Sequence, residues 1–304
     1  MNWYAGNLHC HSTFSDGDAE PKKVAQWYRD HGYSFLSITD HNCLTPIDEY
    51  AENLPDFIGI PGSESTWRAG KTNTHVNGFG IVEKIPLPER DLTAIETLQF
   101  AIDGIKKKGG LAMINHPCWL WSFGSKEMKK LKGAHFFEVW NGGPTSNNEG
   151  GSGHESTDEI WDALLSEGIK IFGIAADDAH HYQDISVSPM GNRNAPGTGW
   201  VWVYAQELNC DSILKSLEEG NFIASNGMKL KRLERSPEKL ALEIDPPGPY
   251  MAFKTTFIGK NGSILSVQEG LTPFYEPRGD EGYVRAKIVS SSGIQGWVQP
   301  VFLS

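Results

Sequence analysis

Short apolar runs alternate with amphipathic segments between residues 7 and 205 of the chain, and this alternation constrains the fold more than any other feature. The runs stand at residues 35–38, 57–60, 76–82, 111–114, 136–139 and 171–175. Short runs that are apolar throughout are typical of strands buried on both faces of a parallel sheet. Strands that alternate with helices predict an α/β fold built on a parallel sheet or barrel.

The segments between the runs carry helix signals. Thr93 and Glu96 form a capping box, and an apolar stripe at residues 95, 98, 102 and 105 follows it at helical spacing. Further helical patterns begin near Val24 and cover residues 158–165 and 211–217. Each of these patterns ends near a glycine, as helices commonly do.

The sequence pattern changes after residue 228. Strand patterns cover residues 240–244, 251–258, 264–267, 283–289 and 296–303, with turn sequences at residues 260–262 and 291–293 and no helical pattern between them. We therefore predict two domains, an α/β domain over residues 1–228 and a small antiparallel β-domain over residues 229–304.

Metal-ligating residue types gather where the apolar runs end. In α/β folds the functional groups lie at the carboxyl ends of the strands. Six of the ten histidines fall at strand ends or starts. His75 precedes its run instead of following it, so its strand is reversed or the residue lies on a loop.

The stretch His9-Cys10-His11 places two imidazoles on one face of an extended chain and the thiol on the other. Such a pair can chelate a divalent metal ion. Asp16 follows in a Ser-Asp-Gly turn, from which its carboxylate can reach the same place. The alternative is a surface pair, or two histidines satisfied by ordinary hydrogen bonds.

Composition narrows the class of protein. Among 304 residues, 38 are acidic and 27 are Lys or Arg, giving a formal net charge of −11. This balance argues against binding to nucleic-acid polymers or anionic membranes, and it suits a protein that holds divalent cations. The four cysteines form no C-x-x-C pair, and neither a long apolar span nor a signal peptide is visible. We expect a cytoplasmic protein with reduced thiols, unless a signal peptide was trimmed from the native chain.

Four groups of polar motifs follow one another along the chain. In their order, they resemble the motifs of the PHP (polymerase and histidinol phosphatase) superfamily of metal-dependent phosphoesterases, over roughly residues 7–228. The matching segments are His9-Cys10-His11-Ser12 with Ser15-Asp16-Gly17, Ile38-Thr39-Asp40-His41-Asn42, Gly62-Ser63-Glu64 with His75 and Asn115-His116-Pro117, and Asp177-Asp178-Ala179-His180. Two positions depart from the common pattern. Asp16 replaces a histidine, a variation found within the family, and Asp177 stands where serine is usual.

The resemblance implies a distorted, TIM-like (β/α)7 barrel with two or three divalent metal ions. It implies that the first ion is held by His9, His11, Glu64 and Asp178. Glu64 would bridge to a second ion held by His75 and His116, and Asp16, His41 and His180 would hold a third. A mixed set of imidazoles and carboxylates suits Zn, Mn or Fe better than Mg or Ca. Metals that share a carboxylate can also share a hydroxide, which would attack phosphorus without a Ser or Cys nucleophile.

Three residues are predicted to be catalytic: Asp40, His180 and Arg193. Asp40 would donate a proton or hydrogen-bond a ligand histidine, with a plain turn residue as the alternative. Arg193 would clamp a phosphate, with a surface role as the alternative. Glu138 and Asn141 end a strand and are further candidates to face the site. The tryptophans next to the motifs, Trp67, Trp119, Trp121 and Trp140, form either an aromatic wall or ordinary packing, and ordinary packing is favoured.

These observations predict a metal-dependent hydrolase, most concretely a phosphoesterase that cleaves a small phosphomonoester or phosphodiester. The expected partner is a small phosphorylated molecule, with no nucleic-acid polymer and no membrane, and the oligomeric state is left open. One alternative keeps the metal site and hydrolyses a carboxylic ester or a carbamate. A second alternative is a non-enzymatic, metal-stabilised scaffold whose β-domain binds a partner.

Overall fold

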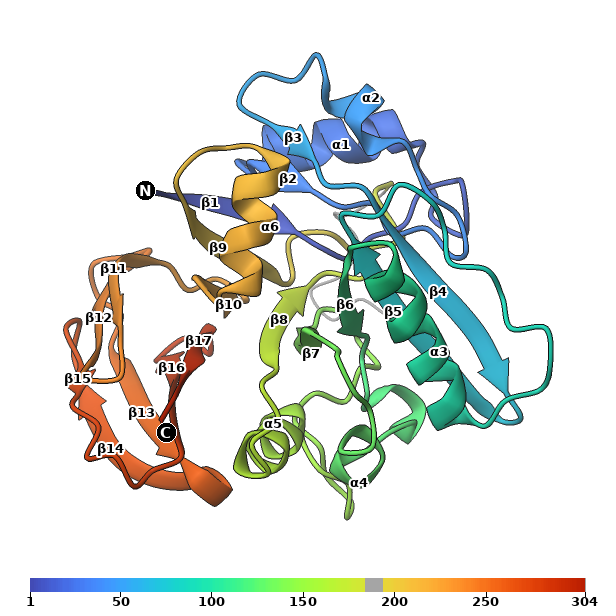
Figure 1. Ribbon diagram of the computed structural model, residues 1–304. Helices are drawn as coiled ribbons and strands as arrows, with labels where there is room; N and C mark the ends of the chain where they lie inside the picture. The colour runs from blue at the N-terminus through green and yellow to red at the C-terminus, as the bar shows by residue number, and fades with distance from the viewer. Residues whose placement is uncertain (184–193, 304) are drawn as a thin grey trace.

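The computed structural model describes residues 1–183 and 194–303, and its strands form three sheets (Figure 1). The strands of the first part are β1 (Asn2–Asn7), β2 (Phe35–Leu36), β3 (Ile58–Gly59), β4 (Gly62–Ala69), β5 (Thr72–Phe79), β6 (Leu111–Ile114), β7 (Phe136–Asn141), β8 (Phe172–Ala176), β9 (Trp200–Ala205) and β10 (Phe222–Ser225). The helices are α1 (Pro21–Asp30), α2 (Ile47–Ala51), α3 (Ala94–Lys107), α4 (Ser125–Met128), α5 (Thr157–Ser166) and α6 (Cys210–Glu218), with a 3-10 turn η1 (Trp119–Trp121).

The expected barrel strands are divided between two sheets. One has the order β4-β5-β6-β7-β8, and the other contains β9-β1-β2-β3. The sheets are joined by two isolated parallel bridges, Cys10 to Ala179 and His41 to Glu64. β2 and β3 are only two residues long, so their ladders are too short to continue around a ring. The α/β class is confirmed, but the described residues form no single closed seven-stranded ladder.

β5 runs antiparallel to both of its neighbours, β4 and β6. β4 and β5 form a hairpin whose turn includes Gly70, which has a φ of 63° that glycine adopts readily. The reversed strand predicted for His75 is therefore confirmed. The predicted capping box is present as well, because Thr93 and Glu96 exchange both of its hydrogen bonds at the start of α3.

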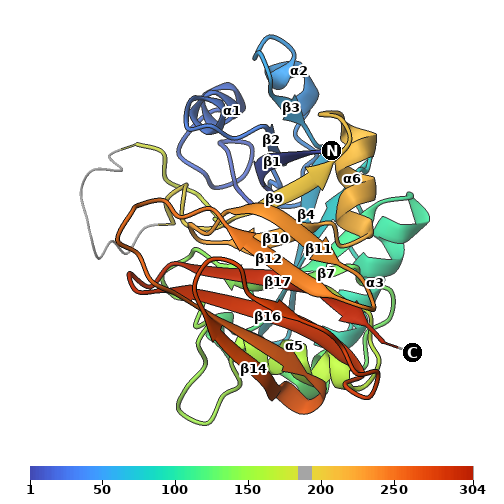
Figure 2. The ribbon, with the colours of Figure 1, turned by 90° about the vertical axis from the view of Figure 1, so that its left-hand side faces the viewer.

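The strands after residue 228 pair antiparallel; four of them continue the sheet of the first part, and the other three form a separate sheet (Figure 2). They are β11 (Leu230–Arg235), β12 (Leu240–Ile244), β13 (Phe253–Gly259), β14 (Ser263–Glu269), β15 (Phe274–Tyr275), β16 (Tyr283–Ser290) and β17 (Gln295–Phe302), with a 3-10 turn η3 (Lys260–Gly262) between β13 and β14. β17 pairs with β10, where Ile223 lies opposite Val298. The division at residue 228 remains a prediction, because the two parts share one sheet.

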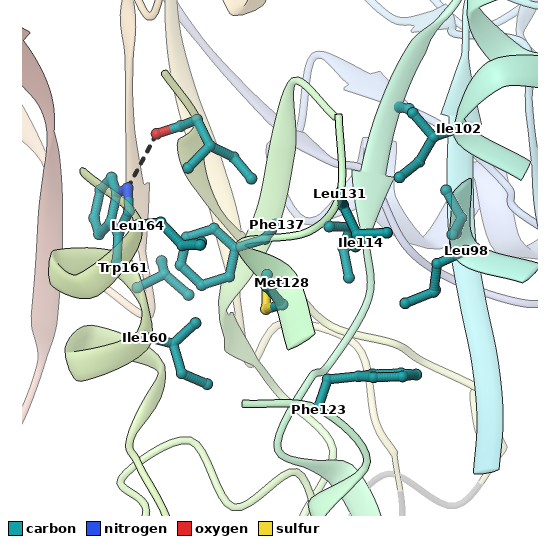
Figure 3. Close-up of a cluster of buried hydrophobic side chains, with 14 of the residues drawn as sticks. Leu98, Ile102, Ile114, Phe123, Met128, Leu131, Phe137, Ile160, Trp161 and Leu164 are labelled. Atoms are coloured by element: carbon teal, nitrogen blue, oxygen red, sulfur yellow. Dashed lines mark hydrogen bonds between the residues drawn. The ribbon is translucent and has the colours of Figure 1, made fainter. Parts of the chain in front are cut away.

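The largest buried cluster lies between the five-stranded sheet and helices α3 and α5 (Figure 3). Phe137 of β7 packs edge-on to Trp161 of α5, and the indole of Trp161 donates a hydrogen bond to the carbonyl of Ile171. Tyr283 and Trp297 from the C-terminal strands belong to the same cluster. Within the described ranges, no helix is long and apolar enough to cross a membrane.

Candidate metal centre

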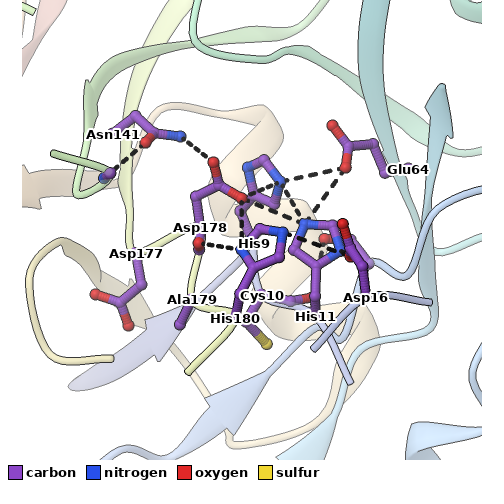
Figure 4. A network of polar contacts seen from close by, with 12 residues as sticks. His9, Cys10, His11, Asp16, Glu64, Asn141, Asp177, Asp178, Ala179 and His180 are labelled. Atoms are coloured by element: carbon purple, nitrogen blue, oxygen red, sulfur yellow. Dashed lines mark hydrogen bonds and ion pairs between the residues drawn. The ribbon is translucent and has the colours of Figure 1, made fainter. Parts of the chain in front are cut away.

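His9 and His11 lie just beyond β1, in an extended segment held on both sides. The backbone N–H of His11 donates to the carbonyl of Ala179 at 2.8 Å, and that of Asp178 donates to the carbonyl of His9 at 2.9 Å. The expected alternation is present, because the two imidazoles lie together while Cys10 turns away toward the carbonyl of Ser37 (Figure 4). The strand itself ends earlier than predicted, at Asn7.

Four side chains converge at this point. Nε2 of His9 and Nε2 of His11 are 3.2 Å apart. Oε2 of Glu64 lies 3.5 and 3.4 Å from these nitrogens, and Oδ1 of Asp178 lies 3.2 and 3.3 Å from them. Ligand atoms that share one ion tetrahedrally, at about 2.0–2.1 Å, lie about 3.3–3.4 Å apart. The spacing of these side chains therefore fits a shared metal ion.

Glu64 faces a different set of groups with each of its two oxygens. While Oε2 faces His9 and His11, Oε1 lies 2.8 Å from Nδ1 of His75 and 3.9 Å from Nε2 of His116. The side-chain amide of Asn115 donates to the same Oε1 at 2.7 Å. A carboxylate placed in this way can bridge two ions.

A third group of ligand atoms lies nearer to solvent. Asp16, half exposed, is 3.4 Å from Nε2 of His41 and 3.5 Å from Nε2 of His180. His11 approaches the same carboxylate with Nδ1 at 3.6 Å. All nine predicted ligand residues thus belong to one continuous cluster, within which four overlapping groups have ligand atoms within 4.8 Å of one another.

Two histidines of the cluster have fixed tautomers. Nδ1 of His9 lies 2.6 Å from Oε1 of Glu138, and a carboxylate can only accept, so Nδ1 carries the hydrogen. Nδ1 of His180 likewise donates to the carbonyl of Asp178 at 2.8 Å. In the neutral rings Nε2 then presents a lone pair to the cluster, which is the form that binds metal.

The carboxylates of the cluster stay ionised although they are buried. Burial opposes ionisation of Glu64, but His41, His75 and His9 hold the pKa of its carboxyl well below its usual range. Burial also opposes ionisation of Asp178, and its histidine neighbours lower the pKa of that carboxyl in the same way.

The charges and burial within the cluster shift the pKa values of two histidines in opposite directions. Burial alone would lower the pKa of His41, but Glu64 and Asp16 raise it to about 10. Burial, with repulsion from His75, lowers the pKa of His116 to about 4, so this ring is neutral at pH 7. The cluster therefore attracts cations through its carboxylates and offers at least one neutral imidazole.

Divalent metal ions fit these residues. Oε2 of Glu64 is fully buried, and the atoms nearest to it include Nδ1 of His41 at 2.9 Å and Nε2 of His11 at 3.4 Å. A buried, ionised oxygen needs positive charge beside it, which a protonated His41 or a divalent ion can supply. The nitrogens nearest to it belong to imidazoles, and within the described residues no lysine or arginine lines the pocket above the cluster. The donor set of imidazole and carboxylate suits Zn, Mn or Fe.

The pocket over the cluster has a volume of about 170 Å³. Its described lining is made by Asp16, His41, Glu64, His75, His116, Trp119, Gly143, Thr145, Ser146, Asp178, His180 and Asn194. Trp119 is the one tryptophan of this lining. Trp140, by contrast, packs against Trp297 and donates to the carbonyl of Thr198, as the packing alternative predicts.

Asp40, predicted to be catalytic, is fully buried beside the cluster. Its carboxylate accepts from the backbone and hydroxyl of Ser12, the hydroxyl of Ser15 and the hydroxyl of Thr45. No hydrogen bond to a histidine is found for it in the described part of the chain. Asp40 therefore shapes the turn that carries Asp16. Arg193, the predicted phosphate clamp, lies outside the described residues, whereas His180 lines the pocket.

Asp177, the unusual acid of the last motif, points away from the cluster (Figure 4). Its carboxylate accepts the backbone N–H groups of Thr198 and Gly199 and the hydroxyl of Tyr28. It therefore anchors the segment that leads into β9. Of this pair, Asp178 is the one whose carboxylate lies beside His9 and His11.

The role of Glu138 could be read only in part from the sequence. Its carboxylate binds His9, the backbone N–H of His116 and the side-chain amide of Asn141. An acid within an otherwise apolar run, residues 136–139, was the signal of a buried polar role. Asn115 is a second such residue, and it was visible only as part of the motif Asn115-His116-Pro117.

A comparison with solved structures finds the same architecture in a two-domain protein from Bacteroides vulgatus that contains a predicted PHP-like metal-dependent phosphoesterase. The TM-score is 0.58 at 17% identity, over 98% of this chain and 95% of that one. The chain has a PHP-like fold. The resemblance seen in the motifs is therefore confirmed at the level of the fold, and the structural alignment extends over both parts of the chain.

Two further structures share less with this PHP-like chain. A protein proposed to be a metal-dependent phosphoesterase, from Bifidobacterium adolescentis, aligns with a TM-score of 0.44 at 14% identity, over 58% of this chain and 87% of its own. An amidohydrolase from Chromobacterium violaceum, solved with sulfate and no metal, aligns with a TM-score of 0.43 at 16% identity, over 62% of this chain and 93% of its own. No family model and no curated protein matches the sequence.

Proposed function

We propose that the chain is a metal-dependent phosphoesterase that hydrolyses a small phosphomonoester or phosphodiester in the pocket above the histidine–carboxylate cluster. The observation that carries the proposal is the position of Glu64, whose two oxygens face different groups of imidazoles. When bound, two or three divalent ions would activate water and neutralise charge on the phosphoryl group.

The chain's own residues would hold and orient this centre. His9, His11, Glu64 and Asp178 would hold one ion, Glu64 with His75 and His116 a second, and Asp16, His41 and His180 a third. Glu138 fixes the orientation of His9, and Asn115 fixes that of Glu64. His180 lines the pocket and is the candidate to move a proton there. A cytoplasmic location belongs to the proposal and is supported by the four unpaired cysteines.

The test measures metal content and turnover together. Protein purified without chelator is expected to contain at least two metal ions per chain and to hydrolyse 4-nitrophenyl phosphate with added Mn²⁺ or Zn²⁺. His9→Ala and Glu64→Gln should abolish turnover, and His31→Ala, on the surface at the end of α1, should leave it unchanged. Fewer than one metal ion per chain would contradict the proposal.

One observation favours a second candidate, the hydrolysis of a carboxylic ester or a carbamate. The described pocket lining contains no lysine or arginine to bind a phosphate dianion, and a neutral carbonyl group needs none. 4-Nitrophenyl acetate and an aryl carbamate should therefore be assayed beside the phosphate. Turnover of these substrates without turnover of any phosphate ester would replace the first candidate by the second.

A further inference from the structure

Trp119 forms an aromatic side of the pocket next to two predicted metal ligands. Its indole ring lies edge-on to the imidazoles of His75 and His116, with ring centroids 5.6 and 5.2 Å apart. The side chain is partly buried and lines the pocket, whereas the neighbouring Trp121 is outside the lining. The part of a bound substrate that extends from the metal centre toward this side of the pocket would contact the indole ring of Trp119.

The turn that carries Trp119 is conformationally unusual. Leu120 and Trp121 have φ values of 53° and 55°, in the left-handed region that residues other than glycine rarely adopt. Such conformations persist only where surrounding contacts hold them, and they concentrate at functional sites. Here the N–H of Trp119 donates to the carbonyl of His116, and Trp121 stacks on His154 with centroids 4.2 Å apart.

A second loop fixes the same turn from outside. The side-chain amide of Asn147 donates to the carbonyl of Cys118 at 3.2 Å, and the thiol of Cys118 reaches the carbonyl of Glu155 at 3.5 Å. The same loop contributes Thr145 and Ser146 to the pocket lining. The position of Trp119 is therefore set by contacts outside the pocket, and its ring is available to a substrate.

The size and charge of the pocket limit what can lie against Trp119. A volume of about 170 Å³ is below the range of about 300–1,000 Å³ typical of larger ligands. Metal ions and the phosphoryl group would occupy part of this volume, so only a small group fits against Trp119. The lining beyond the cluster is neutral: Gly143, Thr145, Ser146 and Asn194. Beyond the cluster, the described lining offers no lysine or arginine to a second anionic group on the substrate.

We propose that Trp119 determines specificity at this site and that the substrate is the phosphomonoester of a small, uncharged aromatic alcohol. This inference rests on the proposed phosphoesterase function. One water molecule adds across the phosphorus–oxygen ester bond, which releases inorganic phosphate and the free alcohol. The ring of the alcohol packs against the indole, a contact in which aromatic groups gain more than burial alone provides.

Calorimetry with two phosphonates, which are not hydrolysed, tests the proposal on the metal-loaded protein. Benzylphosphonate should bind about tenfold more tightly than methylphosphonate, as expected when roughly 50–60 Å² of apolar surface is buried. Trp119→Ala and Trp119→Leu should remove most of this preference while metal content stays constant. Trp67→Ala, a change of the same size on β4 and outside the described pocket lining, should preserve it. 4-Carboxybenzylphosphonate should bind more weakly than benzylphosphonate.

The outcomes separate the inference from the function on which it rests. If inorganic phosphate and both phosphonates fail to bind the metal-loaded protein, the proposed phosphoesterase function is wrong. If benzylphosphonate and methylphosphonate bind equally well, only the substrate class is wrong. If the Trp119 variants lose metal and weaken both ligands by the same factor, Trp119 merely supports His75 and His116, and its role in specificity is overturned. Circular dichroism establishes that at least one of the two Trp119 variants is folded.

Discussion

Nδ1 of His9 lies 2.6 Å from Oε1 of Glu138, and both side chains are fully buried. Because Glu138 can only accept, this contact directs the lone pair of His9 Nε2 toward Glu64 and Asp178. Through its other oxygen Glu138 also holds the backbone of His116. One carboxylate that is not itself a predicted ligand thus positions two of the residues that are.

Glu138→Gln is expected to weaken metal binding about 10- to 100-fold, the usual effect of losing a carboxylate behind a ligand histidine. The amide preserves the size of the side chain but can present its NH₂ group to His9, which disturbs the fixed tautomer. Metal titration followed by a competing chelator measures the change. Glu83→Gln, an exposed residue paired with Lys108, is the control and should show no effect. Equal affinities in both variants would refute the positioning role.

Asp177 and Asp178 are adjacent in sequence and differ in function, which gives a matched pair of variants. Asp178→Asn should lose metal and activity, because it removes a ligand charge from the cluster. Asp177→Asn should retain metal and lose about 1–3 kcal/mol of unfolding free energy, because its amide disturbs a buried hydrogen-bond network. Metal analysis and urea unfolding of both variants distinguish the roles. Loss of metal from Asp177→Asn would show that it supplies a ligand after all.

Most of the predictable residues of the site share one property: they follow a locally recognisable apolar run. His9, Glu64, His116 and Asp178 follow apolar runs whose carboxyl ends meet in an α/β fold, so local pattern and a general rule of topology were sufficient. The capping box of α3 was predictable for the same reason, since both of its residues lie within one turn.

The pairing of strands that are distant in the sequence could not be predicted from local sequence patterns. The contact of β10 with β17 joins Ile223 to Val298, and neither segment indicates which strand it will meet. β2 has only two residues in its ladder, although the apolar run around it extends over residues 35–38, because the chain there turns toward the cluster. Local pattern thus predicts elements well, while the sheet order depends on long-range packing.

Removal of the metal ions is expected to lower the melting temperature. Without cations, the buried carboxylates of Glu64 and Asp178 are balanced only by histidines. At a free metal concentration of 1,000 Kd, each site contributes about 4 kcal/mol to stability. Calorimetric melting with and without a chelator measures the loss, and added Zn²⁺ or Mn²⁺ should reverse it. Glu64→Gln should melt at the same temperature under both conditions. An unchanged melting temperature of the unmodified protein would contradict metal binding.

Arg285 joins β16 to α5 through a buried ionic network. Its guanidinium donates to both carboxylate oxygens of Asp162, at 2.6 and 2.7 Å, and lies 2.9 Å from Asp158. Arg285→Met leaves Asp162 without its cationic partner, whereas Asp158 keeps Lys287 at 2.6 Å, and the change should cost about 3–5 kcal/mol of unfolding free energy. Urea unfolding measures the cost, with the exposed Arg278→Met as control. Adding Asp162→Asn to Arg285→Met removes the unpaired charge and should restore part of the loss; a further loss would contradict the network.

His135 makes the stability of the sheet depend on pH. Its Nδ1 accepts the backbone N–H of Ala112 at 3.1 Å, which requires an unprotonated nitrogen. Burial, with a smaller contribution from Lys106, lowers the pKa of His135 in the folded protein, and Glu218 opposes this only in part. The stabilising contribution is therefore complete above pH of about 6.5 and is lost as the pH falls toward the folded pKa, by up to about 1.4 kcal/mol per pH unit.

The variant His135→Gln isolates this effect, because its amide oxygen can accept the same N–H and does not titrate. Urea unfolding at pH 7.5 and pH 5.5 should show a larger loss of stability for the unmodified protein than for His135→Gln. Both proteins carry the same six histidines of the cluster, so the titration of the metal centre contributes equally to each and cancels in the difference. An equal pH dependence of the two proteins would contradict the role of His135 in the stability of the sheet.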